Sequence, residues 1–149
     1  MRWGGPRAIL RAAVADLATR QLVVEGVSAW TRSRPLGPSL REYANGAVVV
    51  RSGLEPREML AVLQAIEVAF GRKRQGQRWR SRTLDLDIVL WSGGCWADEV
   101  LMVPHREFRA RAFVLGPAVQ IAPRWRDPVS GLTLKHLRAR LTRRAPPPR

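Results

Sequence analysis

The segment RKRQGQRWRSRTLDLDI, residues 72–88, combines two features that decide how this chain is interpreted. Its first part carries six Lys and Arg side chains, and such cations bind phosphate oxygens. Its second part alternates Leu and Asp, which predicts a β-strand over residues 83–91 with one apolar face. Asp85 and Asp87 then share the other face, about 6–7 Å apart. Two carboxylates beside a cationic loop suit phosphate groups and the Mg²⁺ that accompanies a nucleotide, so the segment indicates phosphoryl-transfer chemistry.

Each half of this segment also fits a simpler interpretation. An isolated Asp-x-Asp pair is usually a solvated acidic face whose carboxylates pair with nearby arginines. An arginine-rich stretch can be a mobile solvated loop, or a nucleic-acid contact in which Trp79 stacks on a base. The direct succession of the two halves favours the metal and phosphate interpretation over these.

Composition sets the limits of the molecule. The chain has 149 residues, of which 46% are hydrophobic, as expected for one domain with a core. Its net charge of +14 comes mostly from Arg spread along the whole chain, which fits either an anionic ligand or the base composition of the coding genome. Cys95 is the only cysteine, so no internal disulfide can form. No apolar run has the length of a membrane span and no secretory signal is evident, so we expect a cytoplasmic protein.

The elements around the central segment predict an α+β fold. Helix, strand, strand, helix and strand follow in order, and one further strand before them would give the ferredoxin-like βαββαβ pattern, with helical additions at the C-terminus. That first strand is absent from the sequence, and we expect a start upstream of Met1. We expect one domain over residues 1–142 and a disordered Arg/Pro tail over 143–149. The predicted elements are a helix at 7–18, extended chain at 21–34, a strand at 43–51, a helix at 56–70, the strand at 83–91, and helices at 112–121 and 132–141.

Several polar and aromatic side chains are candidates for ligand contacts. Gln64 and Glu67 share one helix face and fit either a nucleotide contact or an ordinary exposed surface. Tyr43 and Phe113 offer rings on which a heteroaromatic ligand could stack, and Asn45 offers an amide to read its edge, although aromatic residues are more often part of a core.

His105 is a further candidate, because Pro104 before it restricts how the chain approaches a site. With one other histidine and one cysteine in the chain, we do not expect a zinc site.

Taken together, these segments resemble the 6-hydroxymethyl-7,8-dihydropterin pyrophosphokinase (HPPK) family of folate biosynthesis. The resemblance covers residues 7–141. The family transfers a pyrophosphoryl group from ATP to the hydroxymethyl oxygen of the pterin and leaves AMP. The motifs that carry the resemblance are SRPLGP at 33–38, YANGA at 43–47, QAIE at 64–67, GRKR at 71–74, RW at 78–79, RTLDLDI at 82–88, VPH at 103–105 and RAF at 111–113.

The resemblance implies a role for each candidate. Asp85 and Asp87 would hold two Mg²⁺ ions, and Arg72 and Arg82 would stabilise charge in the transition state. The implied pterin-binding residues are Ser33, Pro35, Leu36, Tyr43, Asn45, Trp79 and Phe113, and the implied ATP-binding residues are Gln64, Glu67, Arg74, Arg78, Ile88, His105 and Arg111.

The chain departs from the family pattern in three places. The apolar first strand is missing, Arg34 replaces a proline in the pterin loop, and Arg106 stands where an aromatic is familiar. We expect an enzyme that is a monomer, with ATP and the pterin as partners and with no nucleic-acid or membrane partner. The alternatives are a catalytically inactive relative that binds RNA or another anionic ligand, and an enzyme that transfers part of a nucleotide to a different acceptor.

Overall fold

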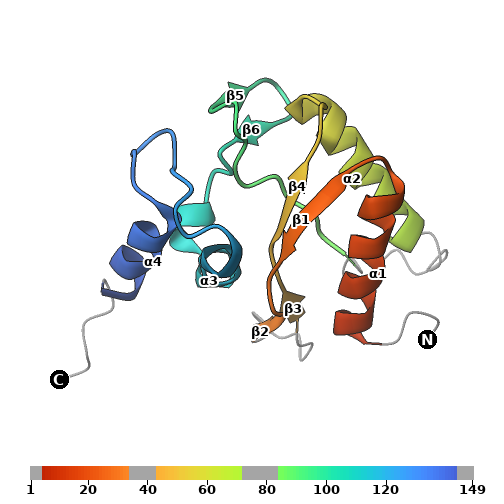
Figure 1. Cartoon of the computed structure of the whole chain (residues 1–149), viewed down its shortest axis with the longest axis horizontal. Coiled ribbons are helices and arrows are strands. Elements are labelled where there is room, and N and C mark those ends of the chain that lie inside the picture. Colours follow the sequence, from red (N-terminus) through yellow and green to blue (C-terminus); the bar gives the residue numbers. More distant parts are fainter. Residues whose placement is uncertain (1–4, 34–42, 72–83, 144–149) are drawn as a thin grey trace.

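The computed structural model describes residues 5–33, 43–71 and 84–143 (Figure 1). Helices and short strands are mixed along the chain, which confirms the predicted α+β class. The elements are α1 (Pro6–Thr19), β1 (Val23–Val27), β2 (Thr31–Ser33), β3 (Tyr43–Asn45), β4 (Val48–Arg51), α2 (Pro56–Gly71), β5 (Trp96–Ala97), β6 (Met102–Val103), a 3₁₀ turn (Phe108–Ala110), α3 (Ala112–Ile121) and α4 (Leu134–Arg143).

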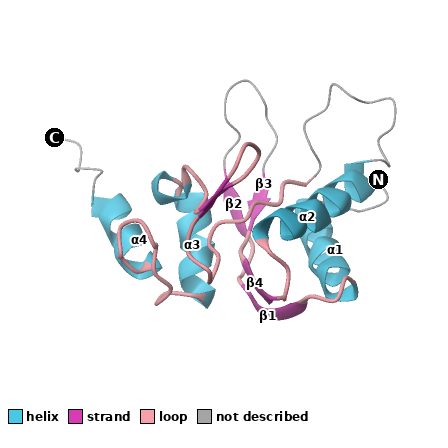
Figure 2. Ribbon diagram, turned by 90° about the horizontal axis from the view of Figure 1, so that it is seen from above, coloured by secondary structure: helices cyan, strands magenta, loops and turns pink. Residues whose placement is uncertain are grey.

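A ribbon of two antiparallel strands, β1 and β4, separates two layers of helices. Helices α1 and α2 lie on one side of it, and α3 and α4 lie on the other (Figures 1 and 2). Neighbouring residues of β4 face opposite layers, since Val48 packs against the first hydrophobic cluster and Val49 against the second. The register shifts between Val24 and Gly26, which marks a β-bulge in β1.

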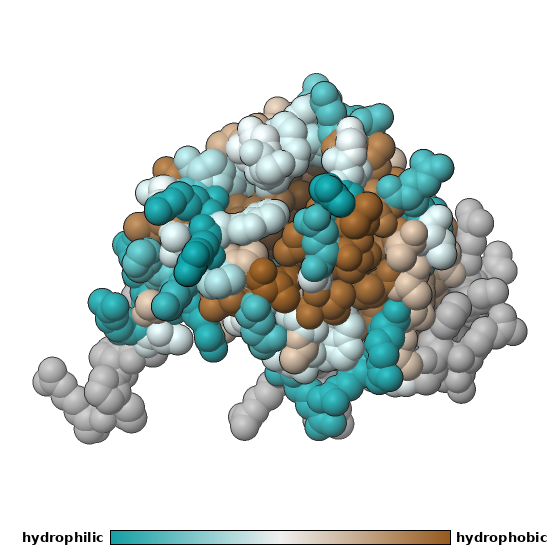
Figure 3. Space-filling model, viewed as in Figure 1, coloured by the Kyte–Doolittle hydropathy of each residue, from teal (hydrophilic) through white to brown (hydrophobic). Residues whose placement is uncertain are grey.

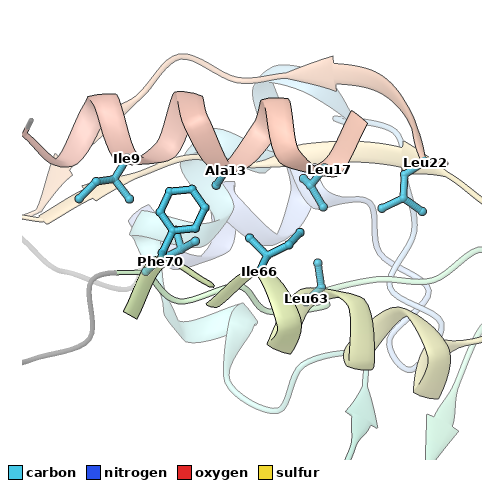
Figure 4. Packing of buried hydrophobic residues seen from close by; sticks show 8 residues of the cluster. Ile9, Ala13, Leu17, Leu22, Leu63, Ile66 and Phe70 are labelled. Carbon is cyan, nitrogen blue, oxygen red and sulfur yellow. The ribbon is translucent and has the colours of Figure 1, made fainter. Parts of the chain in front are cut away.

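The first cluster joins the two amphipathic helices α1 and α2. Ile9, Ala13 and Leu17 recur every four residues along α1, as the sequence pattern predicts, and are buried. They face buried side chains from α2, among them Ile66 and Phe70 (Figure 4). Proline at the first position of each helix suits its start, because that position needs no amide hydrogen bond.

The second cluster lies on the opposite face of the ribbon. It is formed by Phe108, by Leu115 and Ala118 of α3, and by Leu134 and Leu137 of α4. Helix α3 matches its predicted bounds, and α4 begins two residues later than predicted. Neither outer edge of the ribbon pairs with another strand in the described part of the chain. Apolar side chains gather on the face seen in Figure 3. Strand β1 carries the exposed Val23 and Val27.

The prediction of a strand over residues 83–91 is wrong for its described part. Residues 84–88 keep the alternation of a strand, with Leu84 buried and Asp85 and Asp87 exposed, but residues 84–90 belong to no strand ladder. A strand requires hydrogen bonds to a neighbouring strand, and the described part of the chain provides none beside this segment. The predicted strand at 43–51 is likewise divided into β3 and β4, which belong to different two-stranded sheets.

Candidate active site

The acidic segment at residues 84–90 is held by its leucines. Leu84 is 5% exposed, and Leu86 and Ile88 pack against the same hydrophobic cluster as α1 and α2. Asp85 and Asp87 alternate with these anchors and are exposed, so their carboxylates project away from the first cluster. The arrangement predicted from the sequence, two acidic side chains on one exposed face, is therefore present without a ladder.

A pair of carboxylates suits a Mg²⁺ ion that is also bound by substrate phosphates and water. It does not suit a metal ion that is held by protein side chains alone. Within the described ranges, no group of three or more His, Cys, Asp or Glu side chains could hold a metal ion. Mg²⁺ is normally bound through one or two carboxylates, with substrate phosphates and waters completing its shell. The pair Asp85 and Asp87 fits this pattern, because both offer hard oxygen ligands on an accessible surface.

Glu67 holds the backbone of the acidic segment. It lies in the last part of α2, where Ile66 and Phe70 on either side of it are buried. The Leu86 amide donates a hydrogen bond of 2.7 Å to the Glu67 carboxylate. Gln64, one turn earlier on α2, is exposed. Of the two residues predicted to share a helix face, Glu67 therefore binds the acidic segment and Gln64 is open to solvent.

His105 lies against the same segment. Its amide donates to the Val89 carbonyl over 3.0 Å, and its Nε2 lies 3.8 Å from Oδ2 of Asp87. Its Nδ1 accepts a hydrogen bond of 3.2 Å from the Glu107 amide. An accepting Nδ1 assigns the proton of the neutral ring to Nε2, which faces Asp87.

A cationic and aromatic pair adjoins this histidine. The Arg111 guanidinium pairs with the Glu107 carboxylate, and it lies over the Phe113 ring at 5.7 Å from the centroid. Phe113 is 40% exposed at the start of α3, so part of its ring is open to a ligand. A series of contacts thus runs from Asp87 through His105, Glu107 and Arg111 to Phe113.

Asn45 presents a buried polar atom that is not hydrogen-bonded. Its Nδ2 is buried and has no hydrogen-bond partner within the described ranges. Such a donor costs stability unless something accepts from it, so it marks a place where a ligand acceptor fits. The next residue, Gly46, lies against Trp30, since a Cβ at that position would come within 2.3 Å of the indole.

The structure describes only part of the predicted site. Ser33 and Tyr43 lie on β2 and β3 and are paired in register, and Ile88 is half-buried against the first cluster. Sequence reasoning missed Glu107 and Trp30; the only signal for Trp30 was the glycine of the YANG motif. The predicted residues that lie outside the described ranges are Pro35, Leu36, Arg72, Arg74, Arg78, Trp79 and Arg82.

Comparison with known proteins identifies the family. The family model of 7,8-dihydro-6-hydroxymethylpterin-pyrophosphokinase (HPPK) matches residues 3–123. The chain belongs to the HPPK family. This confirms the resemblance that the motifs indicated, and the match includes the acidic segment, His105 and the Arg111–Phe113 pair.

Curated HPPK proteins from several bacteria are similar over most of the chain. Three of them bear the name 2-amino-4-hydroxy-6-hydroxymethyldihydropteridine pyrophosphokinase, and these names support the predicted pyrophosphokinase role. The protein from Synechocystis sp. is 43% identical over 86% of this chain and 66% of its own length. The one from Methylorubrum extorquens is 40% identical over 80% and 77%, and the one from Bacillus subtilis is 38% identical over 79% and 71%. The match therefore spans about two thirds to three quarters of these relatives.

None of the described helices is long and apolar enough to cross a membrane.

Proposed function

We propose that this HPPK-family chain transfers pyrophosphate from ATP to 6-hydroxymethyl-7,8-dihydropterin in a Mg²⁺-dependent reaction that leaves AMP. The observation that carries the proposal is the pair of exposed carboxylates, Asp85 and Asp87, held beside His105 directly after an arginine-rich stretch. Phosphoryl transfer depends on positioning and on charge neutralisation more than on covalent catalysis, and this arrangement offers both.

Each described side chain has a task that its geometry supports. Asp85 and Asp87 hold two Mg²⁺ ions, which when bound neutralise phosphate charge. His105 lies beside Asp87, with its Nε2 3.8 Å from Oδ2, and limits the space open to that side chain. Arg111 brings a positive charge beside the site, and its pairing with Glu107 limits the directions in which the guanidinium can point.

The pterin is bound at the other end of the series. Phe113 offers the open part of its ring for stacking, and the unpaired Nδ2–H of Asn45 donates to an acceptor on the edge of the heterocycle. Ser33 and Tyr43 contribute from the neighbouring β2–β3 pair. The remaining roles proposed from the family resemblance are pterin contacts for Pro35, Leu36 and Trp79, transition-state contacts for Arg72 and Arg82, and ATP contacts for Gln64, Arg74, Arg78 and Ile88.

The proposed enzyme is a cytoplasmic monomer with one domain and a ferredoxin-like sheet. Helix α4 extends to Arg143, one residue beyond the predicted domain boundary at 142. Strand β4 pairs with β1 on one edge and has no partner among the described strands on the other. Residues 84–88 have the side-chain alternation of a strand, and Leu84, Leu86 and Ile88 pack in the same cluster as Val24 and Val48. One more strand between β4 and residues 84–90 would satisfy both edges and complete the ferredoxin-like order.

Asp85→Ala and Asp87→Ala test the proposed reaction. The wild-type chain should form AMP from ATP only when both the hydroxymethyl-dihydropterin and Mg²⁺ are present. Each substitution should abolish that activity, because it removes a metal ligand, while circular dichroism stays unchanged because both side chains are exposed. Glu99→Ala, an exposed carboxylate in the β5–β6 turn, is the matched control and should stay active. A folded wild-type chain that binds the pterin but makes no AMP would contradict the proposal.

The net charge of +14 supports a second candidate, a catalytically inactive relative that binds RNA. Exposed Lys135, Arg138, Arg140 and Arg143 on α4 would provide cationic contacts. RNA affinity that falls steeply with salt, together with an absence of pterin binding, would favour this candidate over the enzyme. ATP cleavage with a different acceptor would instead favour another nucleotide-transferring enzyme.

A further inference from the structure

The His105 amide holds the segment that carries Asp85 and Asp87 at its Val89 carbonyl, which lies beyond both aspartates. The segment belongs to no strand ladder, so inter-strand hydrogen bonds with the described strands do not fix its path. Its leucines attach it to the first cluster, but apolar packing is less directional than hydrogen bonding. Two carboxylates that must bind metal at a set spacing need their backbone held more firmly than this.

The hydrogen bond between the Leu86 amide and helix α2 supplies that constraint at the position between the two aspartates. The Leu86 amide, midway between the two aspartates, donates to Glu67 over 2.7 Å. Glu67 is itself fixed, because the neighbouring Ile66 is 0% exposed and Phe70 is 4% exposed in the core. In extended chain the amide points sideways while the side chains point up and down, so this bond holds the backbone without covering the carboxylates.

We propose that Glu67 is a positioning residue that sets the geometry of the Asp85–Asp87 pair through the Leu86 amide. This inference rests on the proposed function, because it concerns the carboxylates that are proposed to hold Mg²⁺. It gives Glu67 a task different from the direct ATP contact that the family resemblance implies. A hydrogen bond that holds a segment of metal ligands acts on metal affinity from outside the coordination shell, and losing such a partner typically lowers affinity or activity 10- to 100-fold.

Two substitutions separate positioning from direct contact. Glu67→Gln keeps a side-chain oxygen that can accept from the Leu86 amide but removes the charge. Glu67→Leu has a similar size and accepts no hydrogen bond. Glu99→Leu serves as the control, because it introduces the same apolar side chain at an exposed carboxylate in the β5–β6 turn. Asp98 joins this turn to Arg57 at the start of α2, away from Glu67.

The readouts are binding of ATP with Mn²⁺, binding of ATP in EDTA, and amide exchange of Leu86. We expect Glu67→Leu to weaken Mn²⁺–ATP binding about 10-fold, to leave metal-free ATP binding unchanged and to speed exchange at Leu86. Glu67→Gln and Glu99→Leu should bind both forms like wild type. Equal losses in Glu67→Gln and Glu67→Leu, or equal weakening with and without metal, would overturn the proposal and indicate a direct ATP contact.

If Glu67→Leu does not fold, amide exchange of the wild-type protein tests the positioning role of Glu67. The Leu86 amide should then be protected relative to Ile88, whose amide has no hydrogen-bond partner in the described part of the chain, and Glu67→Gln should preserve that protection. An unprotected Leu86 amide would overturn the inference. Failure of the proposed function has a different signature, since a chain that makes no AMP could still show the Leu86 protection and its dependence on residue 67.

Discussion

Asp127 and the half-buried Asn45 both carry buried polar atoms, but the hydrogen-bond partners of these atoms differ. The Asp127 carboxylate is 0% exposed and accepts hydrogen bonds from Arg109, Ser130 and the Val129 amide. Asn45 lies in β3 with a buried Nδ2 that donates to nothing in the described ranges. A buried group that is fully paired contributes to folding, whereas one left unpaired is better explained by a ligand.

Asn45→Leu tests this difference directly. The substitution removes a buried unpaired donor, which costs roughly 1–3 kcal/mol, so the free energy of unfolding should be unchanged or higher. Pterin affinity should fall about 10-fold or more, because the edge of the heterocycle loses its donor. Urea denaturation and a pterin-binding titration measure the two effects. A variant that is clearly less stable, with unchanged pterin affinity, would show that Asn45 is a structural residue.

Asp127→Asn should destabilise the second cluster. The Arg109 guanidinium donates to the Asp127 carboxylate over 2.7 Å, and this pairing holds the pKa of Asp127 well below its usual range. Asp127 is buried but Arg109 is about a third exposed, so the loss should be that of hydrogen bonds to a charged group, roughly 1.5–3 kcal/mol, which urea denaturation would detect.

The pH dependence of stability provides a second test of that pair. In the unfolded chain the Asp127 carboxylate has an ordinary pKa of about 4 and takes up a proton below that pH. In the native protein it stays charged at the same pH. The stabilisation is therefore complete above that value and is lost as the pH falls below it. Asp127→Asn should show a shallower loss of stability in acid than wild type, and identical slopes would contradict the assignment.

At the scale of elements, predictions from local sequence patterns were correct, whereas a prediction that depended on a distant strand partner was wrong. The helices were predicted well, because the spacing of residues such as Ile9, Ala13 and Leu17 reports burial within a single segment. The strand at 83–91 was not, because its existence depends on a neighbour that the local sequence cannot supply. The exposed position of its aspartates was nevertheless correct, since alternation depends only on extended backbone.

The site shows the same division. Carboxylates at 85 and 87 were predicted from chemistry and spacing, and the structure exposes both. The contacts of Glu67 with Leu86, and of His105 with Asp87, join residues about 20 positions apart and follow only from tertiary packing. Sequence reasoning could therefore name these residues but could not say which of them touch.

Asp98 provides an element-scale test, because it connects the β5–β6 hairpin to α2. Its carboxylate accepts from the Val100 and Leu101 amides, from the Trp96 indole and from Arg57 at the start of α2. These bonds hold the pKa of Asp98 well below its usual range, the Val100 amide contributing most.

Asp98→Asn should loosen this hairpin. Amide exchange at Val100 and Leu101 should become faster, since the remaining oxygen accepts fewer and weaker hydrogen bonds, while exchange at Ile66 in the core of α2 should not change. Glu99→Gln changes the neighbouring exposed carboxylate and should leave all three amides unaffected. Faster exchange at Ile66 as well would indicate that the whole fold, and not the hairpin, depends on Asp98.

At the scale of the whole molecule, the hydrophobic core consists of two clusters that share no residue. The first is formed by α1, α2 and the leucines of residues 84–88, and the second by α3, α4 and Phe108. Among the described residues, only the β1–β4 ribbon and the segment at 84–90 contribute side chains to both clusters. The candidate site draws on both clusters. The segment of Asp87 packs against the first, while Arg111 and Phe113 lie at the start of α3, which packs in the second.

A thin partition between two cores also has a consequence for protein engineering. Ile66→Val and Leu115→Val remove one methylene group each from opposite compartments and share no buried neighbour within either cluster. Their effects on unfolding free energy, each on the order of 1 kcal/mol, should sum in the double variant to within about 0.5 kcal/mol, as calorimetry of the four proteins in the cycle would show. Each compartment could then be optimised independently of the other, whereas a larger coupling energy would mean that strain crosses the partition.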